Sequence, residues 1–348
     1  MGNLISMSDT NLELQRIRGR NLFIVEGHNE KEKLLSMIIK CFPQMGMSED
    51  NIIIYGTNIY DLYNEIVKEY DSNWDELDVD LPFIVSRKLH YNVPLRKQDF
   101  TNIVLIFDYE RHDPLFSIDK ISRMQSYFTD MADTGKLYIN YPMVESYMHF
   151  DGVPNNSFES TCIPVTLNPG NKYKSLVRDT YIAKLFGLPR KISEILSEKY
   201  YLEEENKRNE CVLQLLSVKN VEKDLKALFS DVQHIINEYI NHDVKSASNQ
   251  IYHTLLDLYL DKGYTYYEYM IYIISNIVYH NICKAKKICF NSYDIEKNEL
   301  QESFRSIDLL DVLNRQNGYS DDSYNGIIWV LNTSVFIVPD YNINLLVL

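Results

Sequence analysis

The stretch from Asn21 to Lys33, NLFIVEGHNEKEK, contains the pattern that decides the fold. Four apolar residues, Leu22–Val25, end in Glu26 and Gly27, and a charged segment with helical spacing follows. A short apolar run closed by a turn residue predicts a buried strand. Glu26 would then lie at the carboxyl end of a strand, where open α/β sheets bind their ligands. A carboxylate there, beside a glycine that allows close backbone approach, is suited to contact a sugar or a metal, or to act as a general base.

A second stretch of the same kind lies further along the chain. Asn102–Asp113, NIVLIFDYERHD, begins with an apolar run and ends in the acids Asp108, Glu110 and Asp113. If both runs are strands of one parallel sheet, their carboxyl ends meet. The acids would then form a cluster of oxygen ligands for a hard cation, Mg²⁺ or Mn²⁺. We expect Asp108 and Glu110 to be metal ligands and Glu26 to transfer a proton as general acid or base.

Two further acids are candidate metal ligands with an alternative explanation each. Asp113 is either a third ligand or a capping acid before Pro114. Glu145 either completes a second metal position or begins the helix that follows Pro142. Acids at strand and helix ends are common as turn and capping residues, so position alone does not decide between these roles.

The remaining patterns predict the fold class and the organisation of the chain. Apolar runs at Asn51–Tyr55 and Leu137–Ile139 alternate with helical patterns, which indicates an α/β fold with a doubly wound, mostly parallel sheet. Near the C-terminus, Ile327–Leu331 and Val335–Val338 are expected strands that could return to this sheet. The expected parts are an N-terminal arm (1–20), a catalytic α/β domain (21–165), a helical region (166–318) and a C-terminal segment with strands (319–348).

Composition limits the class of protein. With a net charge of −14, the chain is unsuited to coat nucleic acid by charge alone, but metal ions can supply the positive field of a nucleic-acid enzyme. Five cysteines without a CxxC pair are typical of a reducing cytoplasm. The most apolar helical pattern, Tyr266–Ile282, contains Glu268 and His280, so we expect no membrane span. No GxxxxGK[ST] or GxGxxG motif is present, so no nucleotide cradle is predicted.

Three motifs resemble the Toprim family, the catalytic fold shared by topoisomerases, primases and OLD-type nucleases. FIVEG at Phe23–Gly27 is similar to the family's strand that ends in Glu-Gly. IFDYE at Ile106–Glu110 resembles its Asp-x-Asp strand, with Glu110 in place of the second aspartate, which keeps the charge and lengthens the side chain. NYPMVES at Asn140–Ser146 is similar to a segment of Toprim-like nucleases of bacterial anti-phage systems such as PARIS. The resemblance covers about residues 21–150.

This resemblance implies an Mg²⁺- or Mn²⁺-dependent endonuclease, a DNase or an RNase, with tRNA as one implied target. It also implies a toxic effector of antiviral defence that is activated through a partner ATPase. A homo-oligomer is compatible with this role. Two alternatives stay open: another Toprim chemistry, such as primer synthesis or strand passage, and a non-catalytic regulatory or assembly module in which Glu110 marks the loss of activity.

Overall fold

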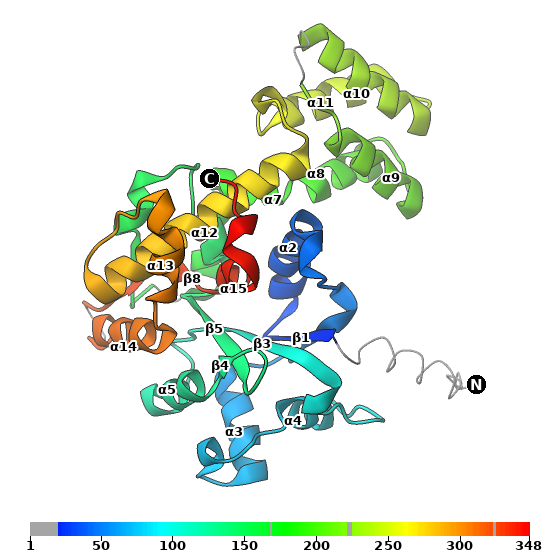
Figure 1. Cartoon of the computed structure of the whole chain (residues 1–348). Coiled ribbons are helices and arrows are strands. Elements are labelled where there is room, and N and C mark those ends of the chain that lie inside the picture. The colour runs from blue at the N-terminus through cyan, green and yellow to red at the C-terminus, as the bar shows by residue number, and fades with distance from the viewer. Residues whose placement is uncertain (1–19, 168, 221–224, 323–324) are drawn as a thin grey trace. The chain divides into compact units, whose positions relative to one another are not determined.

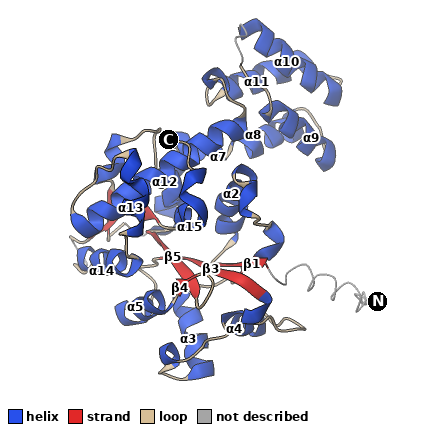
Figure 2. Ribbon diagram, in the orientation of Figure 1, coloured by secondary structure: helices blue, strands red, loops and turns tan. Residues whose placement is uncertain are grey.

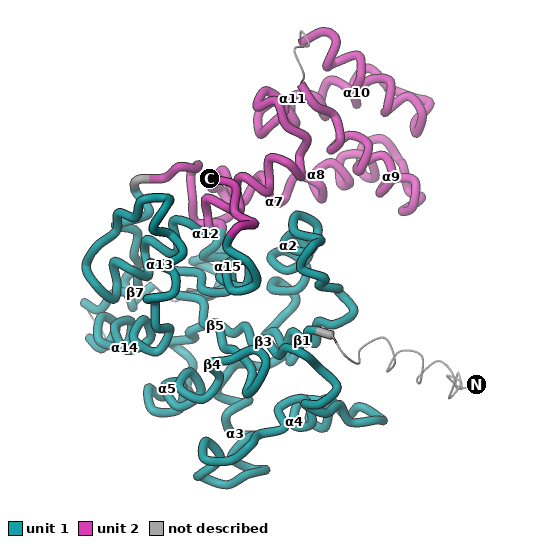
Figure 3. Tube along the Cα trace, viewed as in Figure 1, with its two compact units in different colours: residues 1–147, 157–174, 278–343 teal, residues 148–156, 175–277, 344–348 magenta. Residues whose placement is uncertain are grey.

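The computed structural model of the chain separates into two compact units (Figure 3). The described residues are 20–167, 169–220, 225–322 and 325–348. The expected N-terminal arm therefore lies outside the described residues, apart from Arg20, where the first strand begins. The first unit consists of residues 1–147, 157–174 and 278–343, and the second of residues 148–156, 175–277 and 344–348.

A mostly parallel sheet forms the centre of the first unit (Figure 2). Its strands are β1 (Arg20–Val25), β2 (Ile52–Ile54), β3 (Phe100–Asp108), β4 (Thr129–Asp130), β5 (Gly135–Tyr141) and β8 (Leu331–Asn332). They run in the order β2–β1–β3–β5–β4, and β8 also pairs with β5. The pairs among β2, β1, β3 and β5 are parallel, whereas β4 and β8 are antiparallel to β5. The predicted α/β class with a mostly parallel sheet is confirmed.

Helices cover both faces of this sheet (Figure 1). The helices concerned are η1 (Glu30–Leu35), α2 (Ser36–Cys41), α3 (Ile59–Tyr70), α4 (Leu81–Lys88), α5 (Ile118–Tyr127) and α15 (Ile337–Asn342). Figure 1 shows α3, α4 and α5 on one face, and α2 and α15 on the other. Leu22–Val25 and Ile103–Phe107 are consequently buried on both sides, which explains why these strands are continuous apolar runs rather than alternating ones.

The C-terminal segment returns to the sheet in part. Strand β8, which contains the last residue of the strand predicted at Ile327–Leu331, lies beside β5. The preceding strand, β7 (Ile327–Trp329), instead pairs with β6 (Cys162–Pro164) in a separate two-stranded sheet.

The predicted strand at Val335–Val338 is wrong. These residues form the end of a 3₁₀ turn, η12 (Ser334–Phe336), and the start of α15. All four are buried, and a short, fully apolar run does not distinguish a buried strand from a buried helix. Pro339 lies in the first turn of α15, where its missing N–H group is not required, so it does not end the segment.

The described residues of the second unit form helices and the loops between them, without a strand. Its helices α7 to α11 are α7 (Tyr181–Phe186), α8 (Leu188–Glu194), α9 (Glu205–Leu216), α10 (Leu225–Tyr239) and α11 (Val244–Leu256). In α10, Leu228, Val232 and Ile236 are buried at a spacing of four residues, so one face of this helix packs inward. Helix α12 (Tyr266–Phe290) contributes residues to both units. Helices α13 (Leu300–Arg305) and α14 (Leu309–Tyr319) belong to the first unit. Within the described ranges, no helix combines the length and the apolar character that crossing a membrane requires.

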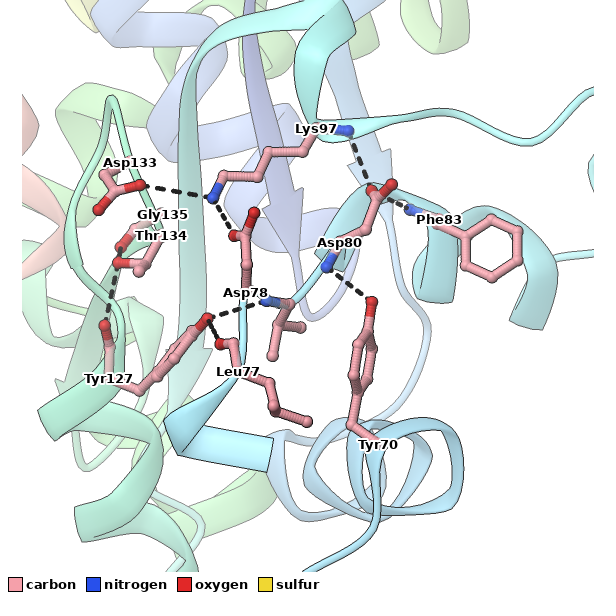
Figure 4. Close-up of polar contacts among 11 residues, drawn as sticks. Tyr70, Leu77, Asp78, Asp80, Phe83, Lys97, Tyr127, Asp133, Thr134 and Gly135 are labelled. Atoms are coloured by element: carbon pink, nitrogen blue, oxygen red, sulfur yellow. Dashed lines mark hydrogen bonds and ion pairs between the residues drawn. The ribbon is translucent and has the colours of Figure 1, made fainter. Parts of the chain in front are cut away.

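Polar contacts fix the segment between α3 and β3 at the amino end of the sheet (Figure 4). The Asp80 side chain accepts hydrogen bonds from the backbone N–H groups of Phe83 (3.2 Å) and Lys97 (2.9 Å). Lys97 Nζ lies 2.5 Å from Asp78 and 3.4 Å from Asp133. Each acid in this network therefore has a donor, and the network lies where β3 begins, at the opposite end of that strand from Asp108.

Candidate metal centre

The parallel pairing of β1 with β3 brings Glu26 and Asp108 together. Val25 is in register with Ile106, and the Glu26 backbone N–H group donates to the Ile106 carbonyl at 3.1 Å. The Asp108 backbone N–H group in turn donates to Glu26 Oε2 at 3.1 Å. The two acids are thus held at the carboxyl ends of adjacent strands, where the sequence predicted them.

Three carboxylates meet at this edge of the sheet. Oxygen atoms of Glu26, Asp108 and Glu110 all lie within 4.8 Å of one another. Asp108 is only 5% exposed, and no donor in the described part of the chain reaches its Oδ1 atom. A buried carboxylate oxygen without a donor is energetically unfavourable, and a cation among the three acids would satisfy it.

Burial and mutual repulsion make these carboxyls difficult to ionise. Burial raises the pKa of Asp108 well above its ordinary value, and the charges of Glu26 and Glu30 raise it further. Burial also raises the pKa of Glu26 well above its ordinary value, against the hydrogen bond from the Asp108 N–H group, while Glu110 adds to the rise. The pKa of Glu110 is raised by burial and then by Asp113. Burial and nearby like charges both raise the pKa of a carboxyl group. A bound cation would instead lower these pKa values.

The loop that carries Glu110 is fixed from both sides. Glu110 itself has φ = +45°, a conformation that non-glycine residues seldom adopt. The Tyr109 hydroxyl contacts Asn317 Oδ1 (2.7 Å) and Ser320 Oγ (2.9 Å). Arg111 donates from Nη2 to the Ser320 carbonyl at 3.2 Å. Anchors on both neighbours of Glu110 therefore hold its strained backbone in place.

Asp113 lies outside the group of three acids, and its hydrogen bonds are those of a capping residue. Its Oδ1 atom accepts from the Leu115 backbone N–H group, and its Oδ2 atom accepts from Asn58 Nδ2, both at 2.6 Å. Of the two explanations for Asp113, these contacts favour the capping acid.

Glu145 lies beside Asp108 and Glu30 rather than in the group of three. It is in the 3₁₀ turn η6 (Val144–Met148) and is 3% exposed. Its Oε1 atom accepts from Asn29 Nδ2 at 2.9 Å, whereas its Oε2 atom is buried and has no donor among the described residues. Its charge raises the pKa of both Asp108 and Glu30. The Oε2 atom of Glu145 is therefore available as a ligand for the second metal position that the sequence suggested.

Two residues that the sequence analysis did not select, Glu30 and Lys174, belong to this centre. Glu30 is 3% exposed, and its Oε2 atom accepts from the Gly27 backbone N–H group at 3.0 Å. Burial raises its pKa. An acid three residues after Gly27, at the start of a helix, is a capping pattern that could have indicated it. Glu30 begins the π-helical turn η1, a form of helix that is frequent at functional sites.

Lys174 supplies positive charge beside these acids. Its Nζ atom lies 3.7 Å from Glu145 Oε1, and its side chain is 43% exposed. Its charge lowers the pKa of Glu30 and of Glu110, against the stronger effect of burial. Since it lies far from the strand ends in sequence, no local pattern could have selected it.

No family model, curated protein or solved structure matches this chain.

Proposed function

We propose that this chain is a metal-dependent nuclease of the Toprim type, which cleaves phosphodiester bonds of nucleic acids. The observation that supports it most is the meeting of Glu26, Asp108 and Glu110 within 4.8 Å at the carboxyl ends of β1 and β3. The order of the two motifs and their place on adjacent parallel strands agree with the Toprim resemblance of the sequence.

The residues present fit Mg²⁺ or Mn²⁺. Both ions prefer carboxylate oxygens, and the buried Asp108 Oδ1 atom has no donor within the described ranges. Asp108 and Glu110 would hold one cation, with Glu26 next to it. Glu145 and Glu30, whose charges act on Asp108, would serve a second. When bound, such ions polarise a phosphoryl oxygen and lower the pKa of a coordinated water.

The side chains themselves supply proton transfer and positive charge. Glu26 has a raised pKa and only one hydrogen-bonded oxygen in the contacts described above, which suits it to hold or accept a proton during the reaction. Lys174, exposed on one side and 3.7 Å from Glu145, would attract a phosphate oxygen of the substrate.

Substrate and partner belong to the same proposal. The resemblance of NYPMVES at Asn140–Ser146 to anti-phage nucleases supports a toxic defence effector that acts on tRNA or DNA and is activated by a partner ATPase. The net charge of −14 agrees with this, because a partner could contribute the basic surface that grips nucleic acid.

The test is cleavage of plasmid DNA and of total tRNA by the purified chain, with Mg²⁺, Mn²⁺ or EDTA. Glu26→Gln is the active-site variant. Glu32→Gln is the matched control, because Glu32 lies close by in η1, its side chain is 66% exposed, and it contacts only His28 in the described contacts. We expect metal-dependent cleavage by the wild type and by Glu32→Gln, and its loss in Glu26→Gln.

If the purified chain cleaves neither substrate, the same comparison is made in cells. Growth arrest during phage infection is scored for the same three proteins in the strain that encodes the chain, where any activating partner is also expressed. If Glu26→Gln arrests growth as the wild type does, the proposal is wrong.

A further inference from the structure

Asn332, at the end of β8, lies in a row of polar residues that crosses the sheet. Asn332 is in register with Asn140 of β5, and Asn140 is in register with Asp108 of β3. Asn332 and Asn140 are both fully buried. Buried amides are unfavourable unless their hydrogen bonds are made, so the contacts of Asn332 indicate what it does.

Asn332 directs both amide hydrogens at the residues on either side of Glu145. Its Nδ2 atom donates to the Val144 carbonyl at 2.9 Å and to Ser146 Oγ at 3.1 Å. Its Oδ1 atom accepts from the Val335 backbone N–H group at 3.2 Å. Since a carbonyl requires a donor and an N–H group an acceptor, these partners fix the orientation of the amide.

The backbone of Asn332 is held as well. Its N–H group donates to Asn281 Oδ1 of α12 at 2.7 Å. Ser146 Oγ also reaches the Leu331 carbonyl at 3.4 Å. Three hydrogen bonds therefore join the turn η6 to the end of β8, and β8 is itself fixed by β5 and α12.

We propose that Asn332 is a positioning residue of the metal centre, which holds the Val144–Ser146 turn so that the Glu145 carboxylate stays beside Asp108 and Glu30. This inference rests on the proposed function. A short 3₁₀ turn has weak hydrogen-bond geometry of its own, and the Glu145 side chain has a single hydrogen bond in the contacts above, from Asn29. The C-terminal segment, 188 positions from Val144, thereby becomes part of the site.

The test is a double-mutant cycle on the full chain, with Mn²⁺ affinity measured by calorimetry. The proteins are the wild type, Asn332→Ala, Glu145→Gln and the double variant. If Asn332 acts through Glu145, each single change weakens Mn²⁺ binding by about tenfold or more, as loss of an outer-sphere partner does. The double variant should then bind no more weakly than Glu145→Gln alone.

Gln316→Ala is the matched control for stability. Gln316 is fully buried and holds the Trp329 backbone of β7 with two hydrogen bonds, of 2.8 and 3.1 Å. None of its described contacts reaches an acid of the metal centre. We expect its Mn²⁺ affinity to stay within about twofold of the wild type, even if its melting temperature falls as far as that of Asn332→Ala.

Asn332→Asp replaces Asn332→Ala if the latter does not fold, because aspartate keeps the acceptor for Val335 N–H and lacks the two donors. The inference is overturned if Asn332→Ala and Asn332→Asp bind Mn²⁺ as the wild type does. It is also overturned if Asn332→Ala weakens binding equally in the wild-type and Glu145→Gln backgrounds. A wild type that binds no Mn²⁺ overturns the proposed function itself, a result distinct from both.

Discussion

The two ends of strand β3 place acids in opposite environments. At the amino end, Asp78 and Asp133 are 80% and 77% exposed at their side chains, and Lys97 lies between them (Figure 4). At the carboxyl end, Asp108 is 5% exposed and its Oδ1 atom has no donor in the described part of the chain. Water and lysine satisfy the first group, whereas the second group lacks equivalent compensation. A cluster of acids therefore indicates a cation site when its carboxylates are buried and lack donors, and not merely because it is acidic.

The largest effect is expected for Glu26→Gln on cleavage. Amide replacement keeps the acceptor for the Asp108 N–H group but removes the proton-transfer group. Loss of general acid–base catalysis typically lowers the rate by about 10²- to 10⁴-fold. Single-turnover cleavage of whichever nucleic acid the wild type cuts measures it, and a decrease of less than tenfold would assign the proton transfer elsewhere.

Asp108→Asn should stabilise the metal-free protein. The change removes a buried charge whose pKa is raised well above its ordinary value by burial and by Glu26. The free energy of unfolding should rise by about 1–3 kcal/mol, the range for relieving a buried group without a partner. Urea denaturation in EDTA measures it. A less stable variant would show that Asp108 is already compensated in the folded chain.

The stability of the metal-free protein should fall as pH rises. The pKa values of Glu26, Asp108, Glu30 and Glu110 are all raised in the folded state. Their contribution is therefore fully present below the ordinary carboxyl pKa of about 4 and is lost as pH increases through the raised values, by up to about 1.4 kcal/mol per pH unit for each group.

Added cation should compensate this loss. We expect the rise in melting temperature caused by Mg²⁺ or Mn²⁺ to be small near pH 5 and to grow toward pH 8, because the cation competes with protons for the same oxygens. Differential scanning fluorimetry across this range, with EDTA as reference, measures it. A cation effect that is independent of pH would place the bound ion away from these carboxyls.

The smallest effect is expected at the amino end of β3. Lys97→Met removes the cation beside Asp78 and Asp133. Exposed pairs of this kind contribute about 0–1 kcal/mol, so thermal unfolding should change little and Mn²⁺ affinity should not change. A loss of Mn²⁺ affinity comparable to that of Asp108→Asn would remove the distinction between the two ends.

The sequence was informative where one local pattern determines the structure. Apolar runs ending in Glu26 and Asp108 predicted strands and the edge at which the acids meet, because parallel strands share the direction of their ends. Lys174 and Asn332 were not selected, since their proximity to the acids depends on how distant segments pack, whereas Glu30 follows a local capping pattern that does not by itself predict burial. The error at Val335–Val338 has a related cause: an apolar run that is buried on all sides lacks the periodicity that separates strand from helix.

The central claim is that the acids at the carboxyl ends of β1 and β3 bind a divalent cation. Calorimetric titration of Mn²⁺ into the metal-free wild type and Asp108→Asn tests it most directly, without need of substrate or partner. We expect saturable Mn²⁺ binding by the wild type. In Asp108→Asn we expect a loss of Mn²⁺ affinity larger than that caused by removing an outer-sphere partner, which is about 10- to 100-fold. Absent binding in the wild type, or equal binding by both proteins, would contradict it.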